Sequence, residues 1–519
     1  MNVNGTLFFR GTISDKGNEL MKSDGTEAGT TIVKDLSPGT YNRWIDGMTN
    51  VSGTLFFFAS PNVDSLKGLW KSDGTDTGTK HFAYFSQSPP FKWYTVVSNK
   101  FFFALPTFPG QLWVSDGSVE GTRSIKNINN TYLDDFKGMN GILYFTATDS
   151  AHGTELWRSD GTDTGTYLVK DINLGAESSS PTSKTVVNGQ LFFLATNNLG
   201  NRDLWKTNGT AAGTVLIKTF GNEYLASPEN ITNINNTLFF NGYTAANGYE
   251  LWKSDGTTNG TILIKDIFSG IYSSAPAYLT NVNNACLFSA NDGNTGTELW
   301  FSDGTSQGTH LVKDINQTTT SSSFPAWSIT PFKNKIYFGA YTPKYGNELW
   351  VTDGTEANTS RVTDIEPGSL SGVNANRIIN YFTSSNKMYF EASTLRYGNE
   401  LWATDGISSN MVKDITSGRT STSFGAGFFP GIIGRYCSID TTTFFLTDIG
   451  KGLWETNGTD NGTTLLRGGL SQGYVKGGLT VVGKNVFFVE QTNSNYYDLW
   501  KTDGTVNGTI KINNAKPKK

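Results

Sequence analysis

An aspartate followed by glycine and threonine recurs along this chain, as in ELWKSDGTTNGTILIKDI at residues 250–267. Such carboxylates could act as general bases or bind a cation. The glycine is present in eleven copies, from Gly25 to Gly504, but the acid becomes Asn208 and Asn457 in two. Asparagine closes a turn as aspartate does, yet it can neither act as a base nor bring charge to a cation. The comparison favours a turn with its glycine at positive φ over an active site.

Other residues that could support catalysis or metal binding are few. The chain has three histidines (His81, His152 and His310) and two cysteines far apart in sequence (Cys286 and Cys437). These numbers do not allow a disulfide framework or a Cys/His metal cluster, and no Ser/His/Asp or Cys/His grouping is evident. We therefore expect no catalytic residue, metal or cofactor, and two buried thiols rather than one long-range disulfide.

Charge and hydropathy exclude several classes of partner. The 41 basic and 45 acidic residues give a net charge of −4 without blocks, which argues against nucleic acid or an anionic membrane as partner. No apolar run approaches the roughly 18 residues of a membrane span. The N-terminal MNVNGTLFF lacks the pattern of a signal peptide, so we expect a mature or excised piece, or another export signal.

A Leu-Trp pair marks an internal repeat of 43 to 52 residues, with Met21 in place of Trp in the first copy. The tryptophans are Trp70, Trp113, Trp157, Trp205, Trp252, Trp300, Trp350, Trp402, Trp454 and Trp500. We interpret residues 1–519 as a single domain of eleven repeats, because no gap is long enough for an inserted domain. The repeats span approximately 1–40, 41–86, 87–130, 131–176, 177–222, 223–270, 271–318, 319–368, 369–420, 421–470 and 471–519.

Each repeat holds four strand-like runs, at residues 229–236, 237–243, 249–254 and 261–267 in the sixth copy. Asn-Asn, Asn-Gly and Asp-Gly between them are typical of tight hairpins. The second run is apolar throughout, as in LFFF at 55–58, and adjacent Leu and Trp must point to opposite faces of the third. A sheet covered on both faces, with four strands per repeat, predicts an all-β fold: a β-propeller of four-stranded antiparallel blades.

Eleven blades exceed the usual number, so the arrangement has two solutions. Even spacing favours one large closed ring; the alternative is two tandem propellers of about five and six blades. Neither end of the chain carries a segment that obviously completes a blade begun at the other end.

The motifs ELWKSDGT (250–257), ELWRSDGT (155–162) and ELWFSDGT (298–305), followed by GT and VKDI, resemble the ELWxxDGT repeat family over essentially the whole chain. The resemblance implies a propeller-like module of secreted or surface-displayed bacterial proteins, often from gliding or type IX-secreting bacteria. It brings no known catalytic residues. The chain departs from the pattern at HFAYFS (81–86), at DGISSNM (405–411) and at LRGG (466–469), and it lacks the sorting domain that often ends such proteins.

Antiparallel topology separates two faces of each blade. The turns joining the first strand to the second and the third to the fourth share one face, here called the regular-turn face. The turns joining the second strand to the third and the blade-to-blade crossings share the other, the irregular-loop face. Because variable loops on a rigid scaffold carry function, we place binding on the irregular-loop face. Aromatics recur on this face just before the innermost strand, at Trp44, Trp93, Tyr278, Trp327 and Phe429, and together with Tyr94 they are the candidate ligand-binding residues.

These observations favour a non-enzymatic, secreted or cell-surface module for adhesion or display that binds an extracellular polysaccharide or another surface protein. It would belong to a larger chain or assembly and insert in no membrane. One alternative is a carbohydrate-active enzyme that uses paired carboxylates on the same face. Another is a purely architectural ring in a cell-surface assembly. The repeated Trp is expected to be a core anchor, and the Asp of VKDI is expected to be solvated or paired with Lys.

Overall fold

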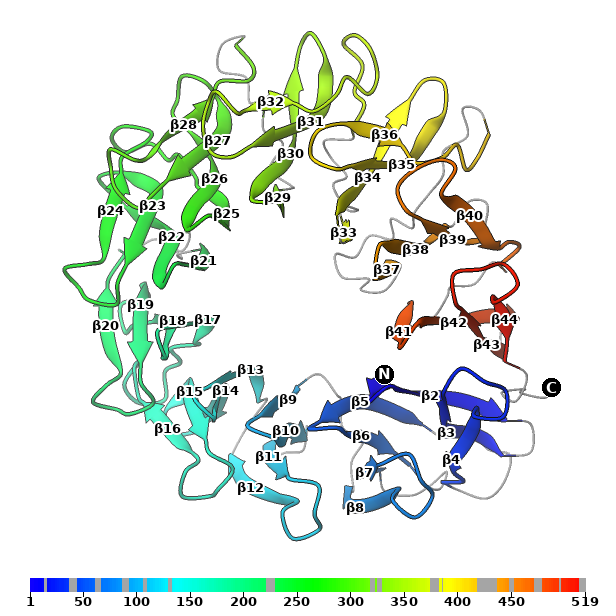
Figure 1. Cartoon of the computed structure of the whole chain (residues 1–519). Helices are drawn as coiled ribbons and strands as arrows, with labels where there is room; N and C mark the ends of the chain where they lie inside the picture. The colour runs from blue at the N-terminus through cyan, green and yellow to red at the C-terminus, as the bar shows by residue number, and fades with distance from the viewer. Residues whose placement is uncertain are drawn as a thin grey trace. The chain divides into compact units, whose positions relative to one another are not determined.

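A computed structural model describes residues 1–13, 16–36, 44–60, 67–85, 93–105, 110–128, 133–220, 229–317, 323, 329–373, 382–384, 386–417, 436–447, 452–470, 478–493 and 496–512. Within these ranges the chain forms β-strands β1 to β44 and no helix (Figure 1), and hence no helix that could cross a membrane. The strands make eleven four-stranded sheets, each ordered as in the sequence and antiparallel throughout. The expected β-propeller of eleven four-stranded blades is confirmed.

The blades fall into two compact units, and the units are not tandem halves of the chain. The first unit comprises Met1–Pro89, Asp116–Arg123 and Ile379–Lys519; the second comprises Pro90–Ser115 and Ser124–Ile378. Blades 1, 2, 9, 10 and 11 therefore belong to the first unit, and blades 3 to 8 belong to the second, apart from the segment Asp116–Arg123 of blade 3. The alternative of two tandem propellers is wrong, because the first unit draws blades from both ends of the chain.

The strands of the second unit are short and evenly built, so each blade repeats the same hairpins. Blades 3, 4 and 5 contain β9 (Tyr94–Val97), β10 (Lys100–Leu105), β11 (Gly110–Ser115), β12 (Arg123–Ile128), β13 (Asp134–Met139), β14 (Ile142–Asp149), β15 (Gly153–Ser159), β16 (Tyr167–Lys170), β17 (Thr182–Val187), β18 (Gln190–Thr196), β19 (Arg202–Thr207) and β20 (Val215–Lys218). Blades 6, 7 and 8 contain β21 (Glu229–Ile234), β22 (Thr237–Thr244), β23 (Gly248–Ser254), β24 (Ile262–Lys265), β25 (Ala277–Val282), β26 (Ala285–Asn291), β27 (Thr297–Ser302), β28 (His310–Lys313), β29 (Ile329–Phe332), β30 (Lys335–Thr342), β31 (Gly346–Thr352) and β32 (Ser360–Arg361).

The first unit repeats this plan with shorter innermost strands in several blades. Blades 1 and 2 contain β1 (Asn2–Val3), β2 (Thr6–Ile13), β3 (Gly17–Ser23), β4 (Thr31–Lys34), β5 (Ile45–Val51), β6 (Thr54–Ala59), β7 (Lys67–Ser72) and β8 (Lys80–Phe85). Blades 9, 10 and 11 contain β33 (Phe382–Ser384), β34 (Lys387–Thr394), β35 (Gly398–Thr404), β36 (Ser409–Met411), β37 (Tyr436–Ile439), β38 (Thr442–Thr447), β39 (Gly452–Thr456), β40 (Thr463–Arg467), β41 (Thr480–Val482), β42 (Asn485–Asn493), β43 (Tyr496–Thr502) and β44 (Ile510–Lys511).

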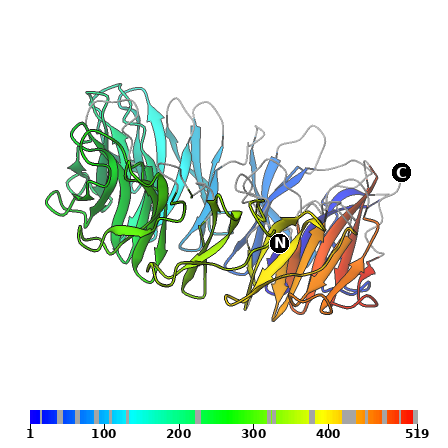
Figure 2. The same cartoon turned by 90° about the horizontal axis from the view of Figure 1, so that it is seen from above.

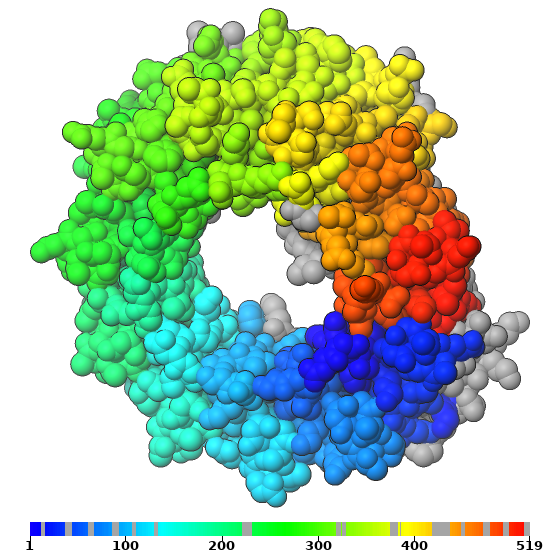
Figure 3. Space-filling model, in the orientation of Figure 1, coloured from blue at the N-terminus to red at the C-terminus, as the bar shows by residue number. Residues whose placement is uncertain are grey.

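The first and last blades pack directly on each other in the first unit (Figure 3), and the strands of the last two blades run side by side (orange and red in Figure 2). Leu7 and Met21 of blade 1 share an apolar cluster with Phe487 of blade 11. The side-chain amide of Asn2 donates a hydrogen bond from Nδ2 to the backbone carbonyl of Val481 at 3.1 Å. Neither end completes a blade of the other, as expected, because β1–β4 and β41–β44 are separate sheets.

The Leu-Trp pair of the third strand supplies the core between blades. Trp252 packs with Phe192 and Ile217 of blade 5, while its neighbour Leu251 packs with Trp300 of blade 7. The two side chains thus leave opposite faces of β23, and blade 6 is covered by both of its neighbours. Large indole rings fill the gap between sheets well, so the expected role of Trp as a core anchor is confirmed.

Polar side chains add links between blades at the outer edge. The ammonium group of Lys170, at the end of β16, donates to the carbonyl of Thr214 in the next blade at 3.0 Å. Lys265 reaches Thr309 in the same way at 2.7 Å. The lysine of VKDI therefore anchors the fourth strand of one blade to the turn of its neighbour.

Candidate functional site

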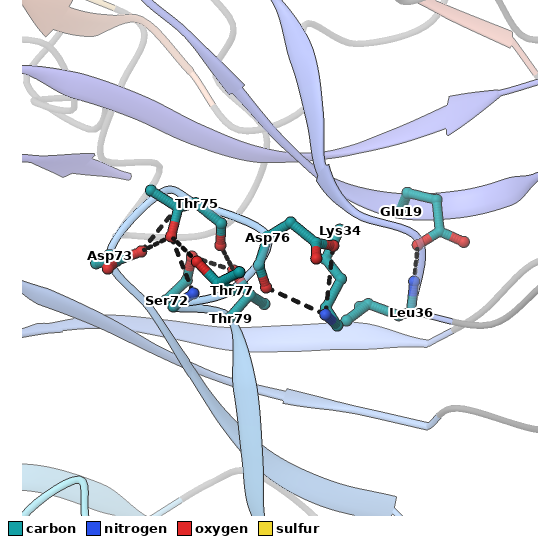
Figure 4. Close-up of polar contacts among 10 residues, drawn as sticks. Glu19, Lys34, Leu36, Ser72, Asp73, Thr75, Asp76, Thr77 and Thr79 are labelled. Atoms are coloured by element: carbon teal, nitrogen blue, oxygen red, sulfur yellow. Dashed lines mark hydrogen bonds and ion pairs between the residues drawn. The ribbon is translucent and has the colours of Figure 1, made fainter.

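The turn between the third and fourth strands is closed by its own side chains, as Figure 4 shows for blade 2. Asp73 Oδ1 accepts hydrogen bonds from Thr75 N at 2.8 Å and Thr75 Oγ1 at 2.7 Å. Thr75 Oγ1 accepts from Gly78 N at 2.9 Å, and the hydroxyls of Ser72 and Thr79 lie 2.7 Å apart. The hydrogen bonds from Thr75 hold the pKa of Asp73 below its usual value. Such a carboxylate is a poor proton acceptor at neutral pH and serves the turn.

The two copies with asparagine make the same turn. Asn208 Oδ1 accepts from Thr210 N at 3.0 Å and Thr210 Oγ1 at 2.8 Å, and Asn457 bonds Thr459 in the same way. The glycine that follows has φ between 83° and 99° in all eleven copies. A residue with a side chain rarely adopts that conformation, which explains why glycine is invariant among the repeats. The structural interpretation of the Asp-Gly-Thr motif is confirmed.

A buried glutamate at the other end of the third strand was missed in the sequence. The Glu250 side chain is 0% exposed, and its carboxylate accepts hydrogen bonds from Ile267 N at 3.0 Å, Phe268 N at 3.2 Å and Ser274 N at 3.1 Å. It also accepts from Ser274 Oγ at 2.6 Å. These donors belong to the crossing that leads from blade 6 to blade 7. Glu250 therefore fixes both ends of that crossing from beneath.

Equivalent residues occupy this position in the other blades. The carboxylates of Glu155, Glu298, Glu348 and Glu400 accept backbone N–H groups of their own crossings in the same way. The position is acidic in eight blades and is Gln or Gly in three: Glu19, Glu155, Asp203, Glu250, Glu298, Glu348, Glu400 and Asp498, against Gly68, Gln111 and Gly452. The sequence feature that could have predicted this buried acid is the repeated Glu of ELW. It becomes informative only after the Leu and Trp that follow it are recognised as core residues.

Burial shifts these carboxyl groups strongly. It raises the pKa of Glu155, Glu250, Glu298 and Glu348 to about 7, against hydrogen bonds that favour the ionised form. A pKa near neutrality suits a general acid or base. However, each of these side chains is 0% exposed and bonded to the crossing that covers it. They are placed to hold loops rather than to meet a substrate.

The crossings of blades 4, 6 and 8 share one further clamp. Gly248, at φ +63°, lies so close to the crossing that a Cβ there would meet Tyr272 O at 2.2 Å. The next residue bonds the crossing twice: Tyr249 N donates to Ser273 Oγ at 3.0 Å, and Tyr249 O accepts from Ala275 N at 3.2 Å. Blade 4 repeats these contacts at Gly153, Thr154, Ser178 and Ser180, and blade 8 at Gly346, Asn347, Ser371 and Val373. Each crossing is thereby held to its own third strand.

The tips of these clamped crossings differ in sequence. In blade 6 the tip is Ile271, 72% exposed, and Tyr272, 59% exposed. The ring of Tyr272 stacks on Phe268 with centroids 5.0 Å apart and planes at 25°. A Cβ on Gly293 of blade 7 would lie 2.4 Å from the Phe268 ring, so this ring is itself wedged against the next blade. Blade 6 thus presents an Ile-Tyr pair on a rigid base.

The other two tips are different. Blade 4 has Ala176 and Glu177 there, with Leu174 80% exposed nearby, and blade 8 has Ser369 and Leu370. The clamp is therefore shared by three blades, while the exposed residues vary from polar to apolar. This combination fits a surface that is rigid in backbone and variable in chemistry.

Three of the candidate aromatics lie at the start of an innermost strand. Trp44 directly precedes β5, is half-buried, and has the ammonium of Lys67 4.6 Å from its ring. Trp93 directly precedes β9 and is also half-buried. Tyr94 is the first residue of β9, and its ring lies 5.7 Å from that of Phe101. Trp93 and Tyr94 are the only two that the described structure places together.

Tyr278 lies inside the strand, as the second residue of β25. It has φ +58° and sits at a bulge, where the register between β25 and β26 shifts. Burial raises its pKa. Blades 4 to 6 separate it from Trp93, and Trp44 belongs to the other unit. Trp327 and Phe429 lie outside the described residues.

The aspartate of VKDI was expected to be solvated or paired with lysine, and in two blades it closes the crossing instead. Asp171 accepts a hydrogen bond from Gly175 N, and Asp266 from Gly270 N, each at 3.1 Å. Asp35 has its expected lysine, with Lys16 Nζ at 2.7 Å. The first two are corrections: a carboxylate at a strand end meets the free amide of the turn that follows.

Two carboxylates of blade 7, Asp292 and Asp314, interact through their charges. The pKa of Asp314 is raised by burial and by the charge of Asp292. Asp292 closes its own loop, since its Oδ1 accepts from Asn294 N at 2.8 Å and Thr295 N at 2.8 Å. Among the described residues no group of three or more His, Cys, Asp or Glu is placed to hold a metal ion.

Both cysteines are free, as expected. Cys286 is fully buried, and burial raises the pKa of its thiol. Cys437 is only partly buried, which differs from the expectation of two buried thiols. It lies in β37 (Tyr436–Ile439), an innermost strand in which no residue is fully buried.

No family model matches this chain, and no curated protein matches it in sequence. Solved structures resemble it only weakly. Puromycin hydrolase is 12% identical, with 67% of this chain and 59% of that chain covered and a TM-score of 0.30. The computationally designed Ika8 protein is 12% identical, with 69% and 93% covered and a TM-score of 0.33. The tricorn protease is 13% identical, with 88% and 43% covered and a TM-score of 0.22. The match therefore covers less than two thirds of the length of puromycin hydrolase and of the tricorn protease.

Proposed function

We propose that this chain is a non-catalytic binding module that recognises a partner protein through the irregular-loop face of its second unit. The observation that carries the proposal is the Ile271–Tyr272 tip, exposed on a crossing that Glu250 and Gly248 hold rigid. Tyrosine is enriched among residues that dominate binding energy, and a preorganised loop loses little entropy on binding. An exposed aliphatic-aromatic pair fits an apolar pocket in a protein.

The regular-turn face supports this assignment by contrast. Its Asp-Gly-Thr turns use their carboxylates and hydroxyls internally and repeat one pattern in blade after blade. A surface of identical closed turns offers little for selective recognition, whereas variable tips on a rigid support do. The resemblance to the ELWxxDGT repeat family adds the setting that we propose, outside the cell or at its surface as part of a larger assembly.

The test is binding of the fluorescently labelled chain to intact cells of its source bacterium, before and after the cells are treated with protease. We expect the double variant Ile271→Ser, Tyr272→Ser to lose at least about tenfold in affinity. Protease treatment of the cells should abolish binding. The matched control is Val506→Ser, which alters an exposed apolar residue on a regular turn and should bind as the wild type does.

Absence of binding, or equal loss with the Val506 variant, would contradict the proposal. Binding that survives protease but is lost after periodate oxidation of the cells would identify a glycan as partner. The half-exposed Trp44 and Trp93 favour that second candidate, because indole rings stack on sugars. In that case Trp93→Ala should reduce binding while the Ile271–Tyr272 variant leaves it unchanged.

Catalysis on carbohydrate is a further candidate, favoured by the burial of Asp314 and the charge of Asp292, which raise the pKa of Asp314. A raised pKa on one of two neighbouring carboxyl groups is the arrangement that glycosidases use. Release of reducing sugar from a panel of polysaccharides, abolished by Asp314→Asn, would establish it. Absence of turnover with a folded wild-type chain would leave binding as the function.

A further inference from the structure

The fourth strand of each blade has one sheet neighbour, so its outer edge carries unpaired backbone groups. Proteins commonly protect such edges with charged or polar side chains. Two residues of the fourth strand lie opposite the Trp of the third strand (Met21 in blade 1) and the residue that follows it. In eight blades at least one of these two fourth-strand residues is polar or charged. These polar residues are Thr31, Lys80, His81, Arg123, Ser124, His310, Ser360, Arg361, Asn410, Thr464 and Lys511.

Blades 4, 5 and 6 are the exception, because both residues are apolar in each. The pairs, here called the apolar stripe, are Tyr167 and Leu168, Val215 and Leu216, and Ile262 and Leu263. Tyr167, Val215, Leu216 and Ile262 are 37% to 43% exposed. These three consecutive edges carry a charge only at their last residue, Lys170, Lys218 or Lys265, so their first two positions are the least protected part of the described outer rim.

The three blades that carry the stripe are tied together at their edges by charged side chains. Arg158 Nη1 donates to Gly209 O at 3.2 Å, between blades 4 and 5. Lys218 of blade 5 places its ammonium 5.0 Å from the ring of Trp252 in blade 6. Strands β16, β20 and β24 therefore follow one another as neighbours along the rim. Exposed apolar residues at the same strand positions of three consecutive blades mark this part of the rim as an interaction site.

Charges lie at the two ends of the stripe's strands and differ in sign. Asp160 and Asp255 lie in the turns that precede β16 and β24, and both turns are on the regular-turn face. Lys170 and Lys265 end the same strands, and each ammonium is fixed on a carbonyl of the next blade. A strand with acid at its start and base at its end is complementary to an antiparallel copy of itself.

We propose that the apolar stripe is the site at which two copies of this chain associate, with a twofold axis through β20. Under that axis β16 of one copy faces β24 of the other, as an isologous contact requires. Lys170 then approaches Asp255 of the partner subunit, and Lys265 approaches Asp160 of the partner subunit. The unpaired edges can hydrogen-bond across the axis by strand addition. A net charge of only −4 on 519 residues opposes this association little.

Sedimentation velocity of the full chain tests the proposal between about 1 and 100 µM, the range in which a weak interface becomes populated. We expect a monomer–dimer equilibrium in the wild type. Leu216→Glu places a carboxylate from each copy beside the axis and should weaken the dimer by about a hundredfold, because a charge would be buried without a partner. Val215→Glu provides an independent variant at the first stripe position.

The matched control is Ile510→Glu, at the equivalent first position of β44, where the residue is 45% exposed beside Lys511. It should leave the dimer unchanged, and circular dichroism should show all variants folded. A wild type that remains monomeric overturns the proposal. So does a dimer that survives both stripe variants, or one that Ile510→Glu disrupts equally. The readout is oligomeric state, so it is independent of partner binding on the irregular-loop face.

Discussion

The two ends of strand β23 show how one chain uses the same chemical group in opposite ways. Asp255 follows the strand on the regular-turn face, where it is exposed and where bonds from the Thr257 side chain and backbone lower its pKa. Glu250, at the other end, is fully buried under the crossing, and burial raises its pKa to about 7. Position, rather than residue type, sets the role of each acid.

The comparison also explains why the two faces differ in variability. The regular turn closes on itself through Asp or Asn, Thr and Gly within eight residues, so few residue types can occupy these positions. The crossing is held from beneath by Glu250 and at one side by Gly248, which leaves Ile271 and Tyr272 free to vary. A fold that fixes a loop by its ends can change the tip without changing the blade.

Removing the buried carboxylate should have the largest effect. Glu250→Ala leaves the amides of Ile267, Phe268 and Ser274 buried without an acceptor, and each unsatisfied donor costs about 1–3 kcal/mol. We expect the free energy of unfolding to fall by at least about 3 kcal/mol in urea titrations. Hydrogen exchange should show loss of protection concentrated in the crossing at 266–276.

The control for that variant lies at the other end of the strand. Asp255→Ala removes exposed turn bonds and should cost about 1 kcal/mol, as the loss of a cap does. A Glu250 variant as stable as the Asp255 variant would contradict the assigned role of the buried carboxylate.

Stability should next depend on pH through the same carboxylates. The pKa of Glu155, Glu250, Glu298 and Glu348 is about 7 in the fold, above the unfolded value of 4.5. The folded chain therefore holds more protons between those values, and its stability falls as pH rises from about 4.5 to about 7. We expect the unfolding free energy at pH 8 to be at least about 1 kcal/mol below that at pH 5.

Glu250→Gln isolates one of these groups. When the unfolding free energy of the variant is subtracted from that of the wild type, the contributions of the other titrating groups cancel. One of these groups is His152, whose pKa is raised by its hydrogen bond to Asp149. The variant should lose less stability than the wild type as pH rises. Parallel pH profiles for the two chains would show that Glu250 does not titrate in this range.

Substitution of two glycines, one on each face, distinguishes the cost of overpacking from the cost of backbone strain. Gly256 has φ +88°, and a Cβ there would lie 2.9 Å from the Phe192 ring; Gly270 has φ +86° and no atom within 4 Å. Gly270→Ala should cost about 1 kcal/mol, the backbone strain alone. Gly256→Ala should cost about 2 kcal/mol, because it adds overpacking against the neighbouring blade. Equal midpoints in thermal unfolding would show that the Phe192 contact relaxes freely.

Much of the fold follows from local patterns, and much of the site does not. The Leu-Trp spacing and the Asn-Gly and Asp-Gly turns predict blades and faces, because strand alternation and turn chemistry act over a few residues. The union of blades 1 and 2 with blades 9 to 11 depends on contacts such as Asn2 to Val481, which no local pattern contains. Tyr278 was placed before its strand because a bulge is not visible in composition. Glu250 was passed over because acids are usually exposed.

The smallest expected effect concerns the motif that first suggested chemistry. Asp255→Asn should change the unfolding free energy by less than about 0.5 kcal/mol, the range of ordinary surface substitutions. Asn208 already makes both bonds to Thr210 that Asp255 makes to Thr257, at similar lengths. The reciprocal change Asn208→Asp should be equally mild. A loss above about 1 kcal/mol in Asp255→Asn alone would mean that the charge itself matters there, and would reopen the question of a cation at these turns.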